Sequence, residues 1–186
     1  MDFILSGFFQ AFQLLLSGNP ETYSAIWATL MVSSYSICSS LIIGIPLGFC
    51  LGYFNFRGKK PIRTIVDTLM ALPTVFIGLL VYAFLTHRGP LGNFGLLFTL
   101  PGIAVGQTIL ALPIVIGLSA TAVESMDKKL RLAIMSMGAN RLQLFLTSLW
   151  EVRHGLLAGA IAAYGRVMTE VGISMMVGGN IKWHTR

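Results

Sequence analysis

Four long apolar runs constrain this chain most, at about residues 26–53, 65–85, 101–122 and 156–177. At about 1.5 Å per helical residue, each run can cross the roughly 30 Å hydrocarbon layer of a membrane. The composition agrees, because 55% of the 186 residues are apolar, 11% are charged, and the mean hydropathy is +0.77. An ordinary soluble domain is less apolar. We therefore predict an all-α integral membrane protein, a single domain over residues 1–186 with four transmembrane helices.

A shorter apolar stretch, residues 3–17, precedes the first run. Its polar residues fall on one face of a helix, namely Ser6, Gln10, Gln13 and Ser17. This pattern favours a helix lying in the membrane interface, although an extension of the first span is the alternative. Asp2 stands where a cleaved signal peptide would carry a cation, which argues against such a peptide.

Cations crowd two of the connections between the apolar runs. Residues 54–64 hold Arg57, Lys59, Lys60 and Arg63, and residues 124–155 hold Lys128, Lys129, Arg131, Arg141 and Arg153. The other connections hold Arg88, Lys182 and Arg186. Cytoplasmic loops are the ones enriched in Lys and Arg, so both crowded connections are predicted to be cytoplasmic and the amino terminus to lie outside. The net charge of +6 follows from this placement and does not indicate nucleic-acid binding.

The segment 124–155 is polar and cationic, although it lies between two apolar runs. Apolar residues recur at helical spacing on both sides of Gly138, and Asn140 can cap the second of two short helices. We predict a cytoplasmic helix-turn-helix with its turn at Gly138. An ordinary connecting loop with some helix in it is the alternative.

Small residues recur at every fourth position of the first span, and they are Ser36, Ser40, Gly44, Gly48 and Gly52. Such a strip lets another helix backbone approach closely. Pro46, Pro73 and Pro113 lie inside apolar runs, where each removes a backbone hydrogen bond and can bend a helix.

Arg166 and Glu170 are charged residues inside the last apolar run. They are four residues apart, so a continuous helix would place them on one face. A charge at mid-membrane costs roughly 2.5 to 3.5 kcal/mol on insertion scales, and less when it is paired or faces water. Two interpretations remain open. The pair forms an internal salt bridge that fixes helix packing, or it lines an anion path to which Arg166 supplies positive charge.

Enzymatic motifs are absent from the sequence. His87, His154 and His184 are scattered, and no HExxH, CxxC or GxSxG pattern occurs. The glycine-rich stretch 52–60 lacks the spacing and the Ser or Thr of a phosphate-binding loop. We expect no metal site and no ATP binding in this chain.

Two stretches carry a family resemblance. The first runs from Ala133 through Gly138-Ala139-Asn140-Arg141 to residues 153–159, and it resembles the cytoplasmic loop of permease subunits of ABC importers. The second covers residues 164–172 and 175–181, and it resembles the branch that imports molybdate, tungstate and sulfate. Over the whole chain, including its first 18 residues, the sequence is most similar to the tungstate-importing members of that branch.

The resemblance implies an inner-membrane permease subunit of an ATP-driven oxyanion importer, with tungstate as the expected anion. A separate cytoplasmic ATPase would bind and hydrolyse ATP, so this chain itself would carry no cofactor. An extracytoplasmic binding protein would deliver the anion, and a second permease copy would complete the path. Permeases of this kind continue with at least one further span, so we expect the chain to be truncated at its C-terminus.

The resemblance also assigns roles to residues of this sequence. Coupling to the ATPase falls to Ala133, Gly138, Ala139, Asn140, Arg141 and Leu142, and the translocation path to Arg166 and Glu170. Two other functions remain open on the residues alone. One is a secondary transporter or channel for small anions, and the other is a membrane scaffold whose cytoplasmic segment recruits a partner.

Overall fold

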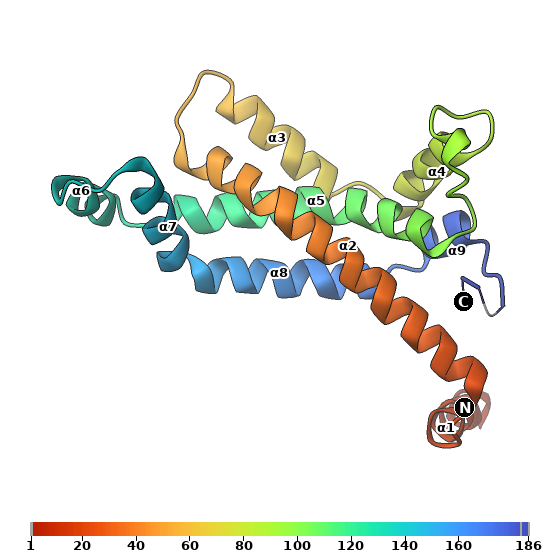
Figure 1. Ribbon diagram of the computed structural model, residues 1–186. Helices are drawn as coiled ribbons and strands as arrows, with labels where there is room; N and C mark the ends of the chain where they lie inside the picture. The colour runs from red at the N-terminus through yellow and green to blue at the C-terminus, as the bar shows by residue number, and fades with distance from the viewer. Residues whose placement is uncertain (1, 183, 186) are drawn as a thin grey trace.

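The computed structural model describes residues 2–182, 184 and 185, and outside this description lie the side chains of Asp2, Phe3, Lys128, Leu130, Arg131, Leu132 and Arg141. The part of the chain so described is almost entirely helical, as predicted (Figure 1). Its elements are α1 (Asp2–Leu16), α2 (Pro20–Tyr53), α3 (Lys59–Met70), α4 (Thr74–Leu85), η1 (Gly92–Phe94), α5 (Leu100–Glu124), α6 (Lys128–Ser136), α7 (Arg141–Glu151), α8 (Arg153–Met168) and α9 (Gly172–Gly178).

Two continuous helices, α2 and α5, are long and apolar enough to cross a membrane. Each begins at a side-chain cap followed by proline. The Asn19 side chain accepts a hydrogen bond from the Glu21 amide, and Thr99 Oγ1 accepts one from the Gly102 amide. Pro46 and Pro113 lie inside these helices, and neither interrupts its helix. The predicted runs 26–53 and 101–122 therefore lie within two continuous helices that have the length and composition of membrane spans.

The other two apolar runs are bent pairs of helices. The axes of α3 and α4 differ by 96° across the break at residues 71–73, and those of α8 and α9 differ by 55° across residues 169–171. The runs 65–85 and 156–177, each predicted as one span, are therefore not continuous helices, and each counts as one span when its bent pair is taken together. In the first pair the cause is Pro73, which caps α4 and disfavours helical backbone at the residue before it.

The predicted strip of small residues packs α2 against α5. A Cβ at Gly48 would lie 2.6 Å from the Ile116 carbonyl oxygen, and one at Gly52 would lie 2.6 Å from that of Ala120. Farther along the strip, Ser36 Oγ donates to the Ala104 carbonyl (3.1 Å) and Ser40 Oγ to the Thr108 carbonyl (3.3 Å). At Gly48 and Gly52 the backbone of α2 therefore approaches that of α5 closely, as small-residue interfaces in membranes allow.

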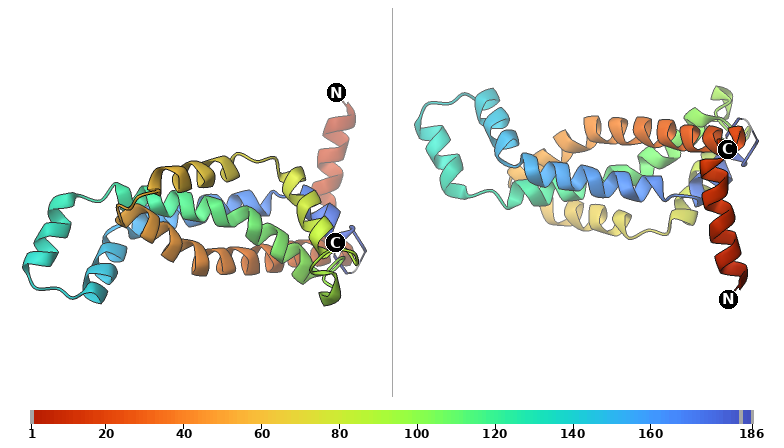
Figure 2. Two further views of the ribbon diagram at one scale, coloured as in Figure 1. Left: turned by 90° about the horizontal axis from the view of Figure 1, so that it is seen from above. Right: turned by 90° about the horizontal axis from the view of Figure 1, so that it is seen from below.

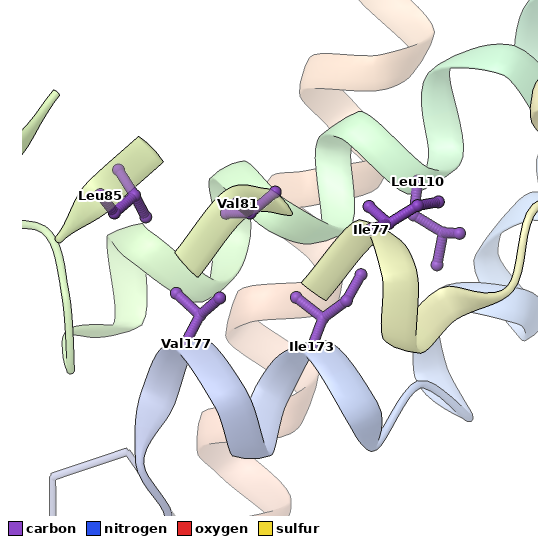
Figure 3. Close-up of a cluster of buried hydrophobic side chains, with 6 residues drawn as sticks. All are labelled: Ile77, Val81, Leu85, Leu110, Ile173 and Val177. Carbon is purple, nitrogen blue, oxygen red and sulfur yellow. The ribbon is translucent and has the colours of Figure 1, made fainter. Parts of the chain in front are cut away.

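The second halves of the two bent pairs pack on each other. Ile77 and Val81 of α4 point toward Ile173 and Val177 of α9, and Leu110 of α5 closes the cluster (Figure 3). The space for this contact comes from glycine, because a Cβ at Gly106 of α5 would lie 2.6 Å from Ile173 Cγ2.

The molecule has two different ends. At one end α6 and α7 project beyond the bundle, on the same side as the α2–α3 loop, and α4, η1 and α9 lie at the other (Figure 1). Two further views agree, and they show α1 extending away from the start of α2 (Figure 2). The helix predicted over 3–17 is thus present as α1, and its large apolar side chains from Ile4 to Leu16 are exposed.

Candidate coupling segment and translocation path

The projecting helices α6 and α7 are shaped by local sequence signals. The Asp127 carboxylate accepts a hydrogen bond from the Lys129 amide (2.8 Å) and so caps α6. Gly138 turns the chain at φ +78°, a conformation that glycine adopts without strain. Asn140 and Gln143 then form a reciprocal capping box at the start of α7, with bonds of 2.8 and 2.9 Å. The structure thus has its turn at Gly138 and its cap at Asn140, the positions that the sequence pattern indicated.

The residues expected to couple to an ATPase gather around this turn. Ala133, Gly138, Asn140 and Leu142 are exposed, and Ala139 is half-buried. The side chain of Arg141 lies outside the described part of the chain, although its backbone begins α7. The turn thus presents an exposed edge built of small and apolar residues, which a flat or grooved partner surface can contact closely.

Aromatic rings join α7 to the transmembrane helix α2. The Phe145 ring meets the Phe49 ring edge to face, with centroids 4.6 Å apart, and Phe49 stacks on Tyr53 at 5.1 Å. These rings belong to an apolar cluster that also holds Val123 of α5 and Val152. Helix α7 therefore shares one apolar cluster with the ends of α2 and α5.

Ion pairs fix α3 to the same end of α5. Lys59 Nζ lies 2.9 Å from the Glu124 carboxylate and also donates to the Gly52 carbonyl (3.0 Å). Arg63 reaches the Gly117 carbonyl (3.2 Å) and Thr121 Oγ1 (2.7 Å). Both cations thus hold helix ends together at this end of the molecule.

Arg166 and Glu170 do not share a helix face. Helix α8 ends at Met168, so Arg166 sits in its last turn and Glu170 in the break before α9. The expected common face is absent because the helix is broken between the two residues, at 169–171. Within the described residues no ion pair joins Arg166 to Glu170.

The two side chains have different surroundings. Arg166 is exposed, and a cation in the last turn of a helix suits the negative end of the helix dipole. Glu170 is 8% exposed, and its carboxylate accepts a hydrogen bond from the Ile173 amide (3.1 Å) at the start of α9. Glu170 therefore stabilises the start of α9, whereas the charge of Arg166 lies on the surface of α8.

A line of buried polar groups runs from α2 to this break. Ser36 Oγ lies 3.2 Å from Gln107 Oε1 and shares its single proton between this oxygen and the carbonyls of Val32 and Ala104. Gln107 Nε2 donates to Ser174 Oγ (3.4 Å). Ser174 Oγ in turn donates to the Glu170 carbonyl (3.0 Å). A cavity of about 40 Å³ beside Gln107 and Ser174 is large enough for water.

Gln107 and Ser174 were not among the predicted site residues. Gln107 could have been found from the sequence, because it carries the one side-chain amide of the run 101–122, and a buried amide needs a hydrogen-bond partner. Ser174 gives a weaker signal, because serine occurs often in membrane helices at packing positions.

Taken together, these features define a helical membrane protein with two broken helices and a projecting two-helix segment. Residues 44–182 match the family described as binding-protein-dependent transport system inner membrane component. The chain belongs to this family. Its members are permease subunits of ABC transporters, which are not enzymes themselves and which work with an ATPase and a binding protein.

Individual relatives cover the whole chain. It is 50% identical to the tungstate uptake system permease protein of Campylobacter jejuni over 186 residues, which is 100% of this chain and 78% of that protein. It is 34% identical to the tungstate uptake system permease protein of Peptoclostridium acidaminophilum, again over 100% of this chain and 82% of the relative. The molybdenum transport system permease protein of Escherichia coli is 28% identical over 90% of this chain and 76% of its own length.

Proposed function

We propose that this chain is the membrane-spanning permease subunit of an ATP-driven importer that carries tungstate. The observation that supports this most strongly is the 50% identity to a tungstate uptake permease along the full chain. Identity to the molybdenum permease is lower, at 28%, which favours tungstate within a group of chemically similar oxyanions.

The projecting segment α6–α7 is proposed to dock into the cytoplasmic ATPase. Its contact residues would be Ala133, Gly138, Ala139, Asn140, Arg141 and Leu142. Exposure of the turn and its distance from the bundle support this role (Figure 1). Closure of the ATPase subunits would move α7, and the contact of Phe145 with Phe49 would carry the movement into α2.

The orientation follows from the same segment. An ATPase lies in the cytoplasm, so the end with α6, α7 and the cationic α2–α3 loop would face inward and the amino terminus outward. Each bent pair would count as one span, which gives four spans in the inner membrane. Broken helices in transporters commonly line the substrate path, because irregular backbone is tolerated where it meets a polar cavity.

We further propose that the α8–α9 break borders the anion path, which a second copy of the permease would complete. Arg166 would offer a planar cation that can donate two hydrogen bonds to a tetrahedral dianion. Glu170 would shape the same part of the path by holding the start of α9. An extracytoplasmic binding protein would deliver the anion from the opposite side.

Copurification of an ATPase tests the coupling role. The tagged chain is isolated from native membranes alongside Gly138→Val and Gly138→Asn. Valine is strained at φ +78°, whereas asparagine tolerates this conformation, and a side chain at this position meets no neighbour within 4 Å. We expect the ATPase with the native chain and with Gly138→Asn, and its loss with Gly138→Val. Absence of an ATPase from all three would favour a secondary transporter.

Substitution of Arg166 tests whether this residue lines the anion path, because Arg166 is exposed and its replacement leaves the core intact. We expect Arg166→Ala to lower tungstate uptake by at least tenfold while the protein still inserts and binds its ATPase. Arg166→Lys keeps the charge and should retain part of the uptake. Uptake by Arg166→Ala at the native rate would remove Arg166 from the path.

A further inference from the structure

The α2–α3 loop and the first turns of α3 hold four cations of two kinds. Lys59 and Arg63 are half-buried and pair with Glu124, and Arg63 also pairs with Asp67. Arg57 and Lys60 are exposed, and no salt bridge of either is present among the described residues. Two of the four charges therefore hold the fold together, and two are left to face whatever surrounds the loop.

The exposed cations border a hollow. Residues 55–61 line a surface cavity of about 580 Å³, with Arg57, Lys59 and Lys60 in its wall. Its wall also contains an aromatic side chain, Phe56, which is 44% exposed. The hollow thus combines positive charge with apolar surface, a pairing that suits an amphipathic anion better than a small hydrated one.

The position of the loop in the chain indicates which kind of ligand would occupy this cavity. It directly follows Tyr53, the last residue of the apolar helix α2, so it lies where the hydrocarbon layer of a membrane ends. Ile62, Ile65 and Leu69 form an exposed apolar stripe that continues from the loop along one side of α3. Acyl chains can lie along such a stripe while a headgroup stays beside the cations.

We propose that the cavity lined by residues 55–61 binds the headgroup of an anionic glycerophospholipid, with Arg57 and Lys60 as its charge partners. The apolar stripe of α3 accommodates the acyl chains. This site is separate from the anion path at Arg166, and it requires only that the chain sits in a membrane.

Native mass spectrometry of the purified full-length chain measures the binding directly. Phosphatidylglycerol is titrated against phosphatidylcholine with the same acyl chains. A cation at the membrane surface contributes about fivefold in affinity, so we expect Arg57→Gln and Lys60→Gln each to weaken phosphatidylglycerol binding about fivefold, and the double variant about 25-fold. Phosphatidylcholine binding should not change.

Two matched variants keep the result interpretable. Arg88→Gln removes one exposed cation from the opposite end and should leave phosphatidylglycerol binding unchanged. Arg57→Lys with Lys60→Arg keeps both charges and should bind as the native chain does. Equal affinity of the native chain for the two lipids would overturn the proposal, as would an equal loss in Arg88→Gln. Displacement of the lipid by inorganic phosphate at about 10 mM would show that the cavity binds free anions, and this result would also overturn the proposal.

Discussion

The ring of Phe145 in α7 meets the ring of Phe49 in α2 edge to face, with centroids 4.6 Å apart and planes at 71°. Phe49 is 3% exposed, so the contact is buried although α7 belongs to a segment that projects from the bundle. One side of the pair is thus placed by the spanning helix, and the other by the segment proposed to meet the ATPase. This contact therefore joins the two through side chains, beside the direct chain connection from α7 to α8 at Val152.

The Phe145–Phe49 pair should show a measurable interaction energy. Edge-to-face aromatic pairs contribute about 0.5 to 1.5 kcal/mol beyond the area that they bury. We expect a double-mutant cycle of Phe145→Leu and Phe49→Leu to return a coupling of that size in detergent-induced unfolding. Strictly additive effects of the two variants would mean that the rings do not act as a pair.

The capping box at Asn140 should stabilise α7 locally. Loss of an N-cap side chain costs about 1 kcal/mol, so Asn140→Ala should speed amide hydrogen exchange in the first turn of α7 about fivefold. Asn140→Ser retains a capping oxygen and should exchange at nearly the native rate. Similar exchange in both variants would show that the cap does not hold the helix end.

The close approach of α2 and α5 at Gly48 predicts a sharp steric effect. A Cβ there would lie 2.6 Å from both the Ile116 carbonyl oxygen and Ser119 Cβ, and backbone cannot yield as a flexible side chain can. We expect Gly48→Ala to destabilise the fold by about 1 to 3 kcal/mol in unfolding experiments. Gly165→Ala is the control, because a Cβ at that position of α8 meets nothing within 4 Å and alanine favours helix.

Substitutions of Glu170 separate its hydrogen bond from its charge. Glu170→Gln keeps an oxygen that can accept from the Ile173 amide, whereas Glu170→Leu leaves that buried donor unsatisfied. We expect the leucine variant to lose about 1 to 3 kcal/mol of stability and the glutamine variant much less. A glutamine variant that folds normally but fails to transport would instead assign the charge itself to the path.

Much of the fold could be predicted because its signals are local. The strip from Ser36 to Gly52 fixes where α5 lies against α2, and Gly138 with Asn140 fixes the turn of the projecting segment. Each signal depends on residue type and helical spacing within a few turns. The same is true of α1, whose apolar run and polar face indicated a helix.

Pro73 marked the run 65–85 as one that can bend, whereas residues 169–171 contain no proline and the second break was not predicted. Residues 71–73 and 169–171 lie between apolar stretches, so the average hydropathy stays high across each break. The Glu170 carboxylate accepts a hydrogen bond from the Ile173 amide at the start of α9, and the spacing of apolar residues does not reveal such a contact. The links from Phe145 to Phe49 and from Gln107 to Ser174 join residues far apart in sequence, and a single sequence does not pair them.

Reconstituted transport tests the central claim most directly. The chain is placed in proteoliposomes with its ATPase inside and its binding protein outside, and tungstate accumulation is measured with ATP, without ATP, and with molybdate or sulfate as competitors. The account predicts uptake of tungstate that requires ATP and the binding protein, and that is inhibited more strongly by unlabelled tungstate than by the other two anions. Tungstate uptake at the same rate without ATP or the ATPase would contradict it.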